Sequence, residues 1–419
     1  MKKVFKKNNI LLKKFLVITA ILMAGCHSED YYIYSSDNLE YLGSDPNPEE
    51  KTVFIEMQPW YGNDNNWYHW SNEYHNPDDI YHLEVIGERD ISSIYYPLIG
   101  AYDSYDTMVI DWQIDISKAM LIDCLMIDYY GDGGFPYNEE FKYYNKVTDK
   151  IISRAEVKDI KVVLLYETQI HNNSQGRVDN IISDLVNILE NTKWMNSKAY
   201  LHYNNVPVIC IFGVNKLAHY EWELVKDSLG DKVALVADTQ PYSYETSYQD
   251  NLVFNGAFAW SLYGDSIKSS ESPSFEVVKT WAELLNDSTG WWANQEDNRF
   301  SFSVIWPGFD DSEVLWGPNG LPRTVNYFTD DYSSDETSFY RATMDAALNS
   351  TYSSNWILIA TLNDWNESTQ IEPSKEKGYL YSIKTKQFIE KFKGVSNIER
   401  KPDSIIQSIT ESYDFSKYQ

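Results

Sequence analysis

The sequence predicts an α/β protein built as a single (β/α)8 barrel with elaborated loops after its strands. Three observations support this prediction. Eight short apolar runs rich in β-branched residues occur along the chain, segments with helical periodicity separate most of them, and about 350 residues fit one such barrel. The sequence contains no internal repeat, no phosphate-binding or dinucleotide glycine motif and no sign of a second domain. A doubly wound open sheet is the alternative, because the region between the fifth and sixth runs has no clear helical pattern.

The eight predicted strands are the apolar runs at 53–57, 124–130, 162–167, 206–212, 233–237, 257–262, 302–306 and 356–362. The predicted helices lie at 108–121, 139–157, 178–191, 217–229, 275–285 and 336–349, with a further one at 384–393. Together these elements predict a catalytic domain over residues 52–400, followed by a polar C-terminal tail at 401–419.

The N-terminus has the pattern of a secretion signal. Lysines precede an apolar stretch of about 10 residues, which is well short of the roughly 20 needed to span a bilayer. Small residues directly before Cys26 resemble a bacterial lipoprotein cleavage site, and ordinary signal cleavage beside an incidental cysteine is the alternative. We therefore expect a signal peptide at 1–25 and a tether at 26–51 that is lipidated on Cys26. These features predict an exported lipoprotein of the outer membrane or the cell surface.

The composition favours a neutral glycan as the partner. The net charge of -27 disfavours nucleic acid and anionic lipid headgroups, so we expect membrane attachment only through the lipid anchor. The chain has 14 Trp, 33 Tyr and 17 Phe, many of them beside Asn, Asp and Gly, and aromatic faces pack against sugar rings. Cys124 and Cys210 lie in apolar runs and are expected to be buried free thiols, with a disulfide as the alternative. We expect a monomer.

The most informative motif follows the last predicted strand. In the segment 363–372, Asp364 and Glu367 are two carboxylates three residues apart, with Trp365 between them. The ends of barrel strands carry the catalytic residues of such folds, and a pair of carboxylates is the usual equipment for cleaving glycosidic bonds. Polar and aromatic residues also follow several other runs, which predicts one shared site rather than separate solvated loops.

Several motifs together resemble glycoside hydrolase family 99, the endo-α-mannosidases and endo-α-1,2-mannanases, with the family 71-like group close by. The resemblance spans residues 53 to 375 in order. Its motifs are the segment around Asp364 and Glu367, Trp60-Tyr61-Gly62-Asn63, Tyr68-His69-Trp70, residues 96–104 and Pro307-Gly308-Phe309-Asp310-Asp311.

The resemblance implies a retaining endo-glycosidase that uses no metal and no other cofactor. By this resemblance Asp364 is the base that removes the proton from the sugar's own 2-hydroxyl, which attacks C1 to give a 1,2-anhydro sugar, and Glu367 is the acid/base. The family usually has Glu where this chain has Asp364. We interpret the change as a subfamily with an adjusted site; a different sugar and a weakened enzyme are the alternatives. Acid catalysis also requires a raised pKa for Glu367, which a neighbouring carboxylate and Trp365 would supply.

Further residues are predicted to bind substrate. Glu167 matches a family glutamate near the 2-hydroxyl, with a salt bridge at the rim as the alternative. Tyr61, Tyr129 and Trp260 are expected to line the subsites unless they only pack in loops, and His69 would bind a hydroxyl unless it is structural. Arg323 would orient the catalytic carboxylates. The remaining predicted binding residues are Trp60, Asp128 and Trp365. The adjacent Asp310 and Asp311 supply too few oxygens for a Ca²⁺ site by themselves.

Two other functions stay open. A family 71-like α-1,3-glucanase would share the barrel and the acidic motif, and a surface glycan-binding lipoprotein would keep the barrel without turnover. The motif residues cannot separate mannose from glucose, because these sugars differ in the orientation of one hydroxyl.

Overall fold

The computed structural model describes residues 49–63, 66–72, 74–81, 87–131, 139–171, 176–238, 253–260, 275–295, 299–316 and 339–419. These residues all belong to one compact unit. Cys26 and the rest of the predicted signal and tether up to residue 48, together with Arg323, lie outside the described residues.

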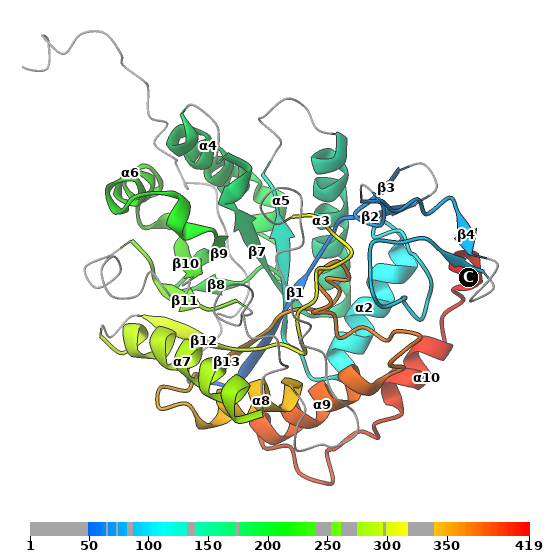
Figure 1. Cartoon of the computed structure of the whole chain (residues 1–419). Coiled ribbons are helices and arrows are strands. Elements are labelled where there is room, and N and C mark those ends of the chain that lie inside the picture. The colour runs from blue at the N-terminus through cyan, green and yellow to red at the C-terminus, as the bar shows by residue number, and fades with distance from the viewer. Residues whose placement is uncertain are drawn as a thin grey trace, which may run out of the picture. The chain divides into compact units, whose positions relative to one another are not determined.

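Eight parallel strands form a closed barrel, as the sequence predicts (Figure 1). In spatial order they are β1 (Thr52–Met57), β6 (Cys124–Tyr129), β7 (Lys161–Glu167), β9 (Val206–Phe212), β10 (Ala234–Asp238), β11 (Gly256–Phe258), β12 (Phe300–Ile305) and β13 (Trp356–Ile359). β13 pairs with β1 and β10 pairs with β9, so the sheet has no open edge between these strands. This closure excludes the doubly wound open sheet.

Helices surround the barrel (Figure 1). They are α2 (Thr107–Ala119), α3 (Glu139–Lys158), α4 (Arg177–Glu190), α5 (Thr192–Met195), α6 (His219–Leu229), α7 (Phe275–Ala293), α8 (Phe339–Asn349) and α9 (Leu380–Lys393). The predicted helices all appear, with α7 eight residues longer than the pattern at 275–285 suggested. No helix in the described ranges is long and apolar enough to cross a membrane.

Several short elements lie in the connections between the main strands and helices and near the C-terminus. The connection between β1 and α2 contains the hairpin β2 (Tyr61–Asn63) and β3 (Asn66–Tyr68), and a second small pair, β4 (Ile80–Tyr81) and β5 (Glu88–Arg89). β8 (His202–Tyr203) pairs antiparallel with β9. Short 3₁₀ turns are η1 (Thr168–His171), η2 (Val214–Lys216), η3 (Gly230–Lys232) and η5 (Ser416–Tyr418).

Apolar side chains fill the inside of the barrel. Alternate residues of each strand face the interior, so Phe54 of β1, Met126 of β6 and Leu165 of β7 all belong to one buried cluster. Cys124 and Cys210 lie in the same cluster as buried free thiols, which confirms that expectation. The next inward position of each of these three strands, two residues further on, carries a carboxylate. The interior therefore changes from apolar to acidic toward the carboxyl ends of the strands.

The last residues fold onto the barrel. Residues 401–419, expected as a polar tail, contain α10 (Ile405–Glu411) and pack against α2. The indole of Trp112 donates to Thr410 Oγ1 over 3.0 Å, and the Tyr418 hydroxyl donates to Asp106 Oδ2 over 2.7 Å. Asp106 is also the N-cap of α2. These contacts attach the C-terminus to the start of the helix.

Candidate active site

The two carboxylates of the motif lie together in a buried turn after β13. Asp364 is 2% exposed and Glu367 is 6% exposed. The Asp364 amide donates to Thr361 Oγ1 over 2.8 Å, and the Glu367 amide donates to Asp364 Oδ1 over 3.0 Å. One oxygen of the Asp364 carboxylate is thus bound to the turn itself. The turn fixes the position of Glu367 relative to Asp364.

The neighbouring asparagines attach this turn to the connection after β1. Asn363 Nδ2 donates to the Gln58 carbonyl over 2.9 Å, and the Gln58 amide donates to Asn363 Oδ1 over 2.8 Å. Asn366 Nδ2 donates to the carbonyls of His69 and Ser92 over 2.9 and 2.7 Å. Both asparagine side chains are buried. The turn is therefore held by hydrogen bonds at both ends, which is what a catalytic pair needs to keep its geometry.

Tyr61 and Trp365 support the turn from behind and do not line a subsite. Both side chains are fully buried. The Trp365 amide donates to the Tyr61 hydroxyl over 2.9 Å, and the Tyr61 ring stacks on Trp70 with ring centroids 3.9 Å apart. The Trp365 indole donates to the Tyr102 hydroxyl over 3.2 Å. The sequence predicts that both residues bind sugar, whereas their packing shows that they hold the turn.

Replacing Tyr61 by Phe is expected to destabilise the protein by about 1–3 kcal/mol, because the buried Trp365 amide would lose its acceptor. Thermal unfolding measures this loss as a lower Tm. Trp222→Phe is the matched control, since it also removes one buried hydrogen bond, from the indole to the Val214 carbonyl over 2.9 Å, but far from the turn. A Tm of Tyr61→Phe equal to that of the wild type would contradict the supporting role.

Three more carboxylates face the same place from the ends of neighbouring strands. They are Glu56 of β1, Asp128 of β6 and Glu167 of β7, and all three are buried. Burial raises the pKa of Asp128 to about 7. Burial, and then the charge of Asp128, raise the pKa of Glu167 and of Glu56 well above the usual glutamate value. The negative charge of ionised Glu367 also raises the pKa of all three carboxyl groups.

This arrangement agrees with the positions predicted for Asp128 and Glu167. In the described part of the chain no Lys or Arg forms an ion pair with Glu167, so the salt-bridge alternative has no support there. Asp128 Oδ1 is buried and has no hydrogen-bond partner among the described residues. A buried acceptor of this kind is suited to a hydroxyl of a bound ligand.

Aromatic rings form one wall beside the carboxylates. Trp60 stacks on His69 with ring centroids 4.0 Å apart and planes at 9°, and Trp316 contacts both rings edge-on. Tyr130 also contacts Trp60, with centroids 6.1 Å apart. Trp316 is 36% exposed, whereas Trp60 is 4% exposed. Trp60 and His69 thus lie where the sequence predicts, and Trp316 was not predicted from the sequence.

His69 is a neutral hydrogen-bonding group. Burial lowers its pKa to about 3. Asn366 Nδ2 donates to two carbonyls, so Asn366 Oδ1, which lies 3.3 Å from His69 Nδ1, is the acceptor of that contact. Nδ1 therefore carries the proton in this contact, and Nε2 lies 3.8 Å from Glu140 Oε1. His69 thus has a structural hydrogen bond on one nitrogen and faces a carboxylate with the other.

Tyr129 does not reach the site. It is the outward neighbour of the inward Asp128, and its ring packs edge-on against Trp194 of α5 with centroids 5.6 Å apart. Strand alternation places it between the barrel and the helices. The expectation that Tyr129 lines a subsite is therefore wrong, and the next residue, Tyr130, lies beside Trp60.

Trp260 is partly buried and joins the site through Glu56, a residue not among the predicted site residues. Its indole N–H donates to Glu56 Oε2. Gln58 Nε2 donates to the other oxygen, Glu56 Oε1, over 2.8 Å. The one signal in the sequence was a single charged residue within the apolar run at 53–57, two positions after Phe54 and therefore facing the same interior.

The Asp310-Asp311 segment supports the same turn. The Asp310 amide donates to the Glu367 carbonyl over 2.9 Å, and Ser368 Oγ donates to the Asp310 carbonyl over 2.8 Å. The described residues include no group of three or more His, Cys, Asp or Glu side chains placed to hold a metal ion. The Asp310 backbone is therefore part of the support of this turn.

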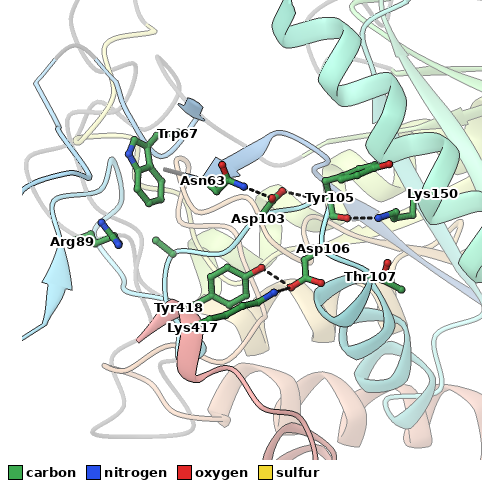
Figure 2. Close-up of a pocket in the computed structure, with 11 residues that line it drawn as sticks. Asn63, Trp67, Arg89, Asp103, Tyr105, Asp106, Thr107, Lys150, Lys417 and Tyr418 are labelled. Carbon is green, nitrogen blue, oxygen red and sulfur yellow. Dashed lines mark hydrogen bonds and ion pairs between the residues drawn. The ribbon is translucent and has the colours of Figure 1, made fainter. Parts of the chain in front are cut away.

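A cavity of about 540 Å³ has none of these carboxylates in its lining. Figure 2 shows the residues that line it. It is bounded by the β2–β3 hairpin, the start of α2, Lys150 of α3 and the C-terminal Lys417 and Tyr418. Its polar groups bond to one another: Asn63 donates to Asp103 over 2.5 Å, Lys150 donates to the Tyr105 carbonyl, and Tyr418 and Lys417 both bond Asp106. We therefore assign it to the packing of the C-terminus and not to the catalytic site.

Comparisons with known proteins point to one family. No family model matches the sequence. Glycoprotein endo-alpha-1,2-mannosidase from Rattus norvegicus is 21% identical over 356 residues, which are 76% of this chain and 67% of that protein. The protein of the same name from Mus musculus is 22% identical over 350 residues, with the same coverage.

Solved structures share the fold. The GH99 endo-alpha-mannosidase from Bacteroides thetaiotaomicron superposes with a TM-score of 0.58 at 19% identity, covering 82% of this chain and 98% of that one. A protein described as glycoside hydrolase-like gives a TM-score of 0.55 at 13% identity, covering 91% and 98%. The comparisons confirm the (β/α)8 barrel and the resemblance of this chain to glycoside hydrolase family 99.

Proposed function

We propose that the protein is an exported, retaining, endo-acting α-glycosidase that cleaves a polysaccharide, with α-mannan as the expected substrate. The observation that carries the proposal is the buried turn after β13, which holds Asp364 and Glu367 next to each other. Further support comes from the buried carboxylates of neighbouring strands and from the aromatic wall around Trp60. Neutral sugars suit such a site, because carboxylates accept hydroxyl protons and rings pack against apolar sugar faces.

In the first proposed step the sugar's own 2-hydroxyl is the nucleophile. Asp364 takes the proton from this hydroxyl, and the oxygen forms a bond to C1 as the bond from C1 to the leaving oxygen breaks. Glu367 gives its proton to the leaving oxygen. The product in the site is a 1,2-anhydro sugar, with Asp364 protonated and Glu367 ionised.

In the second proposed step water opens the anhydro ring. Glu367 takes a proton from the water as the water oxygen bonds to C1, and the bond between C1 and the 2-oxygen breaks. Asp364 returns its proton to that oxygen. Both carboxyl groups regain their starting protonation states, and two inversions at C1 give net retention. Glu167 and Asp128, which lie at the ends of adjacent strands, would accept hydrogen bonds from the hydroxyls of the same sugar.

The shorter Asp364 is compatible with this chemistry if the turn, rather than the side chain, sets the position of its carboxylate. The Asp364 backbone amide donates to Thr361, and the Asp364 carboxylate accepts from the Glu367 amide within the turn. We infer a site adjusted to Asp rather than a weakened one. Misplacement by about 1 Å can cost roughly a hundredfold in rate, so the adjustment has a measurable consequence.

The test of this function is a panel of α-mannans and α-glucans incubated with the protein lacking residues 1–25, with released oligosaccharides followed by chromatography. Mannan products of several lengths are expected. Glucan products alone would place the protein with the α-1,3-glucanases. Retention on a glycan affinity gel without any cleavage would identify a binding lipoprotein.

Export and lipidation remain proposals based on the first 26 residues. Replacing Cys26 by Ser is expected to move the protein from the membrane fraction to a soluble fraction, because the only proposed anchor is a lipid on Cys26. Fractionation of cells and metabolic labelling with a fatty acid measure this. A Cys26→Ser protein that stays in the membrane and keeps its label would contradict the lipoprotein.

A further inference from the structure

We propose that Glu56 is a positioning residue for sugar binding, whose carboxylate holds the indole of Trp260 as a wall of the site. The inference rests on the proposed function and adds a residue to it. Trp260 would contact the sugar, whereas Glu56 would act through Trp260. Neither the resemblance nor the strand pattern assigns a role to Glu56.

The hydrogen bond between these residues crosses the interior of the barrel. Trp260 follows β11, and Glu56 lies on β1, with β12 and β13 between the two strands in the sheet. Inward-facing side chains of strands that are not neighbours can meet in this way across a closed barrel. The Leu362 amide, just before the turn of Asp364 and Glu367, donates to the Glu56 carbonyl over 2.7 Å, and the charge of Glu367 acts on the Glu56 carboxyl. The Glu56–Trp260 contact therefore lies beside the catalytic turn.

Both side chains of the contact are held in a fixed orientation. Gln58 Nε2 bonds the second Glu56 oxygen over 2.8 Å, and the Gln58 backbone is joined to Asn363 in the turn. The Trp260 ring packs against Phe212 and Phe309, with centroids 6.0 and 6.2 Å away. Trp260 stays partly exposed, so part of its ring remains available to a ligand.

Glu56 is a buried acid among other acids, an environment that favours a functional role over a stabilising one. It is 3% exposed. The titratable groups whose charges act with it are Asp128 of β6, Glu167 of β7, Cys210 of β9 and Glu367. None of these is a cation, and burial together with Asp128 raises the pKa of Glu56. Phe54, two residues earlier on the same face, shows that an apolar side chain suits this strand.

The test is a double-mutant cycle of Glu56→Leu and Trp260→Phe, with binding of an α-glycan measured by calorimetry. All forms carry Glu367→Gln, so that the glycan is not consumed. Each single change is expected to weaken binding roughly tenfold, because each removes one end of the same hydrogen bond. The double variant should bind no more than a few-fold more weakly than either single variant. Glu56→Gln keeps an oxygen acceptor for the indole. Its amide N–H can donate to Gln58 Oε1, which is buried without a partner among the described residues, once the Gln58 amide turns. This variant should bind as the parent does.

The unfolding temperature of Glu56→Gln is a second measurement. If Glu56 served only stability, this variant would have a lower Tm than the wild type at pH 7 instead of a higher one. A raised carboxyl pKa means that the folded state holds its proton more tightly, so stability falls as pH rises above the usual glutamate range. Glu56→Gln lacks this loss. Its Tm is expected to match the wild type near pH 4 and to exceed it at pH 7, while the exposed Glu399→Gln should track the wild type at both values.

The outcomes separate this inference from the proposed function. Two results would overturn the role of Glu56 and leave the proposed function standing. One is a loss of glycan affinity in the double variant that equals the product of the two single losses. The other is a Glu56→Gln protein with a lower Tm than the wild type at pH 7. Trp222→Phe should leave the affinity unchanged, since its indole bonds a carbonyl beside α6. A parent protein that binds none of the glycans would refute the proposed function and this inference together.

Discussion

Glu367→Gln is expected to lower the rate of glycan cleavage by about 10³-fold, with little change in affinity for the glycan. The amide cannot give a proton to the leaving oxygen or take one from water, and positioned acid–base groups typically contribute 10²–10⁴-fold. It nevertheless keeps the size of the side chain, and the backbone amide of residue 367 can still donate to Asp364 Oδ1. Initial rates on the most active glycan of the panel measure the effect.

Binding and stability are the controls for this variant. Glu367→Gln should unfold at or above the wild-type temperature, because it removes one of several buried carboxylates that repel one another. A second acid–base test uses a substrate with an activated leaving group, which needs no protonation. The variant should recover part of its first-step rate on such a substrate. A variant that cleaves natural glycan at the wild-type rate would remove Glu367 from the mechanism.

Asp364→Asn is expected to lower the rate of glycan cleavage nearly as much as Glu367→Gln does. Asp364→Glu is expected to lower this rate as well. The amide of Asn is not a base for the 2-hydroxyl. The longer Glu would displace the carboxylate from the position that the turn sets, and a shift of about 1 Å can cost roughly a hundredfold. Single-turnover rates on mannan oligosaccharides separate these effects from product release.

Asp364→Glu distinguishes the two explanations of the shorter acid. If the site is adjusted to Asp, the rate falls, because one oxygen of the Asp364 carboxylate accepts from the Glu367 amide and the turn is built around that bond. If the change weakened an ancestral enzyme, restoring Glu would raise the rate. A large gain from Asp364→Glu would therefore contradict the adjusted site that we infer.

The fold was predictable because each strand of a closed parallel barrel is buried on both faces. Such strands appear in the sequence as short continuous apolar runs, and β1, β7 and β9 match the predicted runs to within one residue. β11 is only Gly256–Phe258, whereas the predicted run extended to residue 262. The C-terminal residues were less predictable, because α10 is stabilised by side-chain contacts with α2 from far away in the sequence.

The site was predictable in its acids and less so in its aromatic residues. Asp128, Glu167, Asp364 and Glu367 follow directly from the rule that the ends of barrel strands share one face. The same rule misplaced Tyr129, because consecutive strand residues point to opposite sides and Asp128 takes the inward position. Glu56 was missed, although it lies within β1 in the same way as Asp128 lies within β6 and Glu167 lies within β7.

Tyr61 and Trp365 show a further limit of the sequence. Both have the residue types of a sugar-binding wall and lie next to the catalytic motif. Their burial depends on Trp70 and Tyr102, which approach from separate segments of the β1–α2 connection. Residue type and spacing carry no information on which side of the turn each ring packs. Only the three-dimensional arrangement assigns them to support.

The most direct test of the central claim is the configuration of the first product formed from an α-linked mannan oligosaccharide. The protein lacking residues 1–25 would be mixed with the substrate, and proton NMR would record the anomeric signals before mutarotation. A retaining endo-α-mannosidase releases the α-anomer of a shorter oligosaccharide first, and Glu367→Gln should give no such signal on the same timescale. Release of the β-anomer first, or no cleavage by the wild type, would contradict the account.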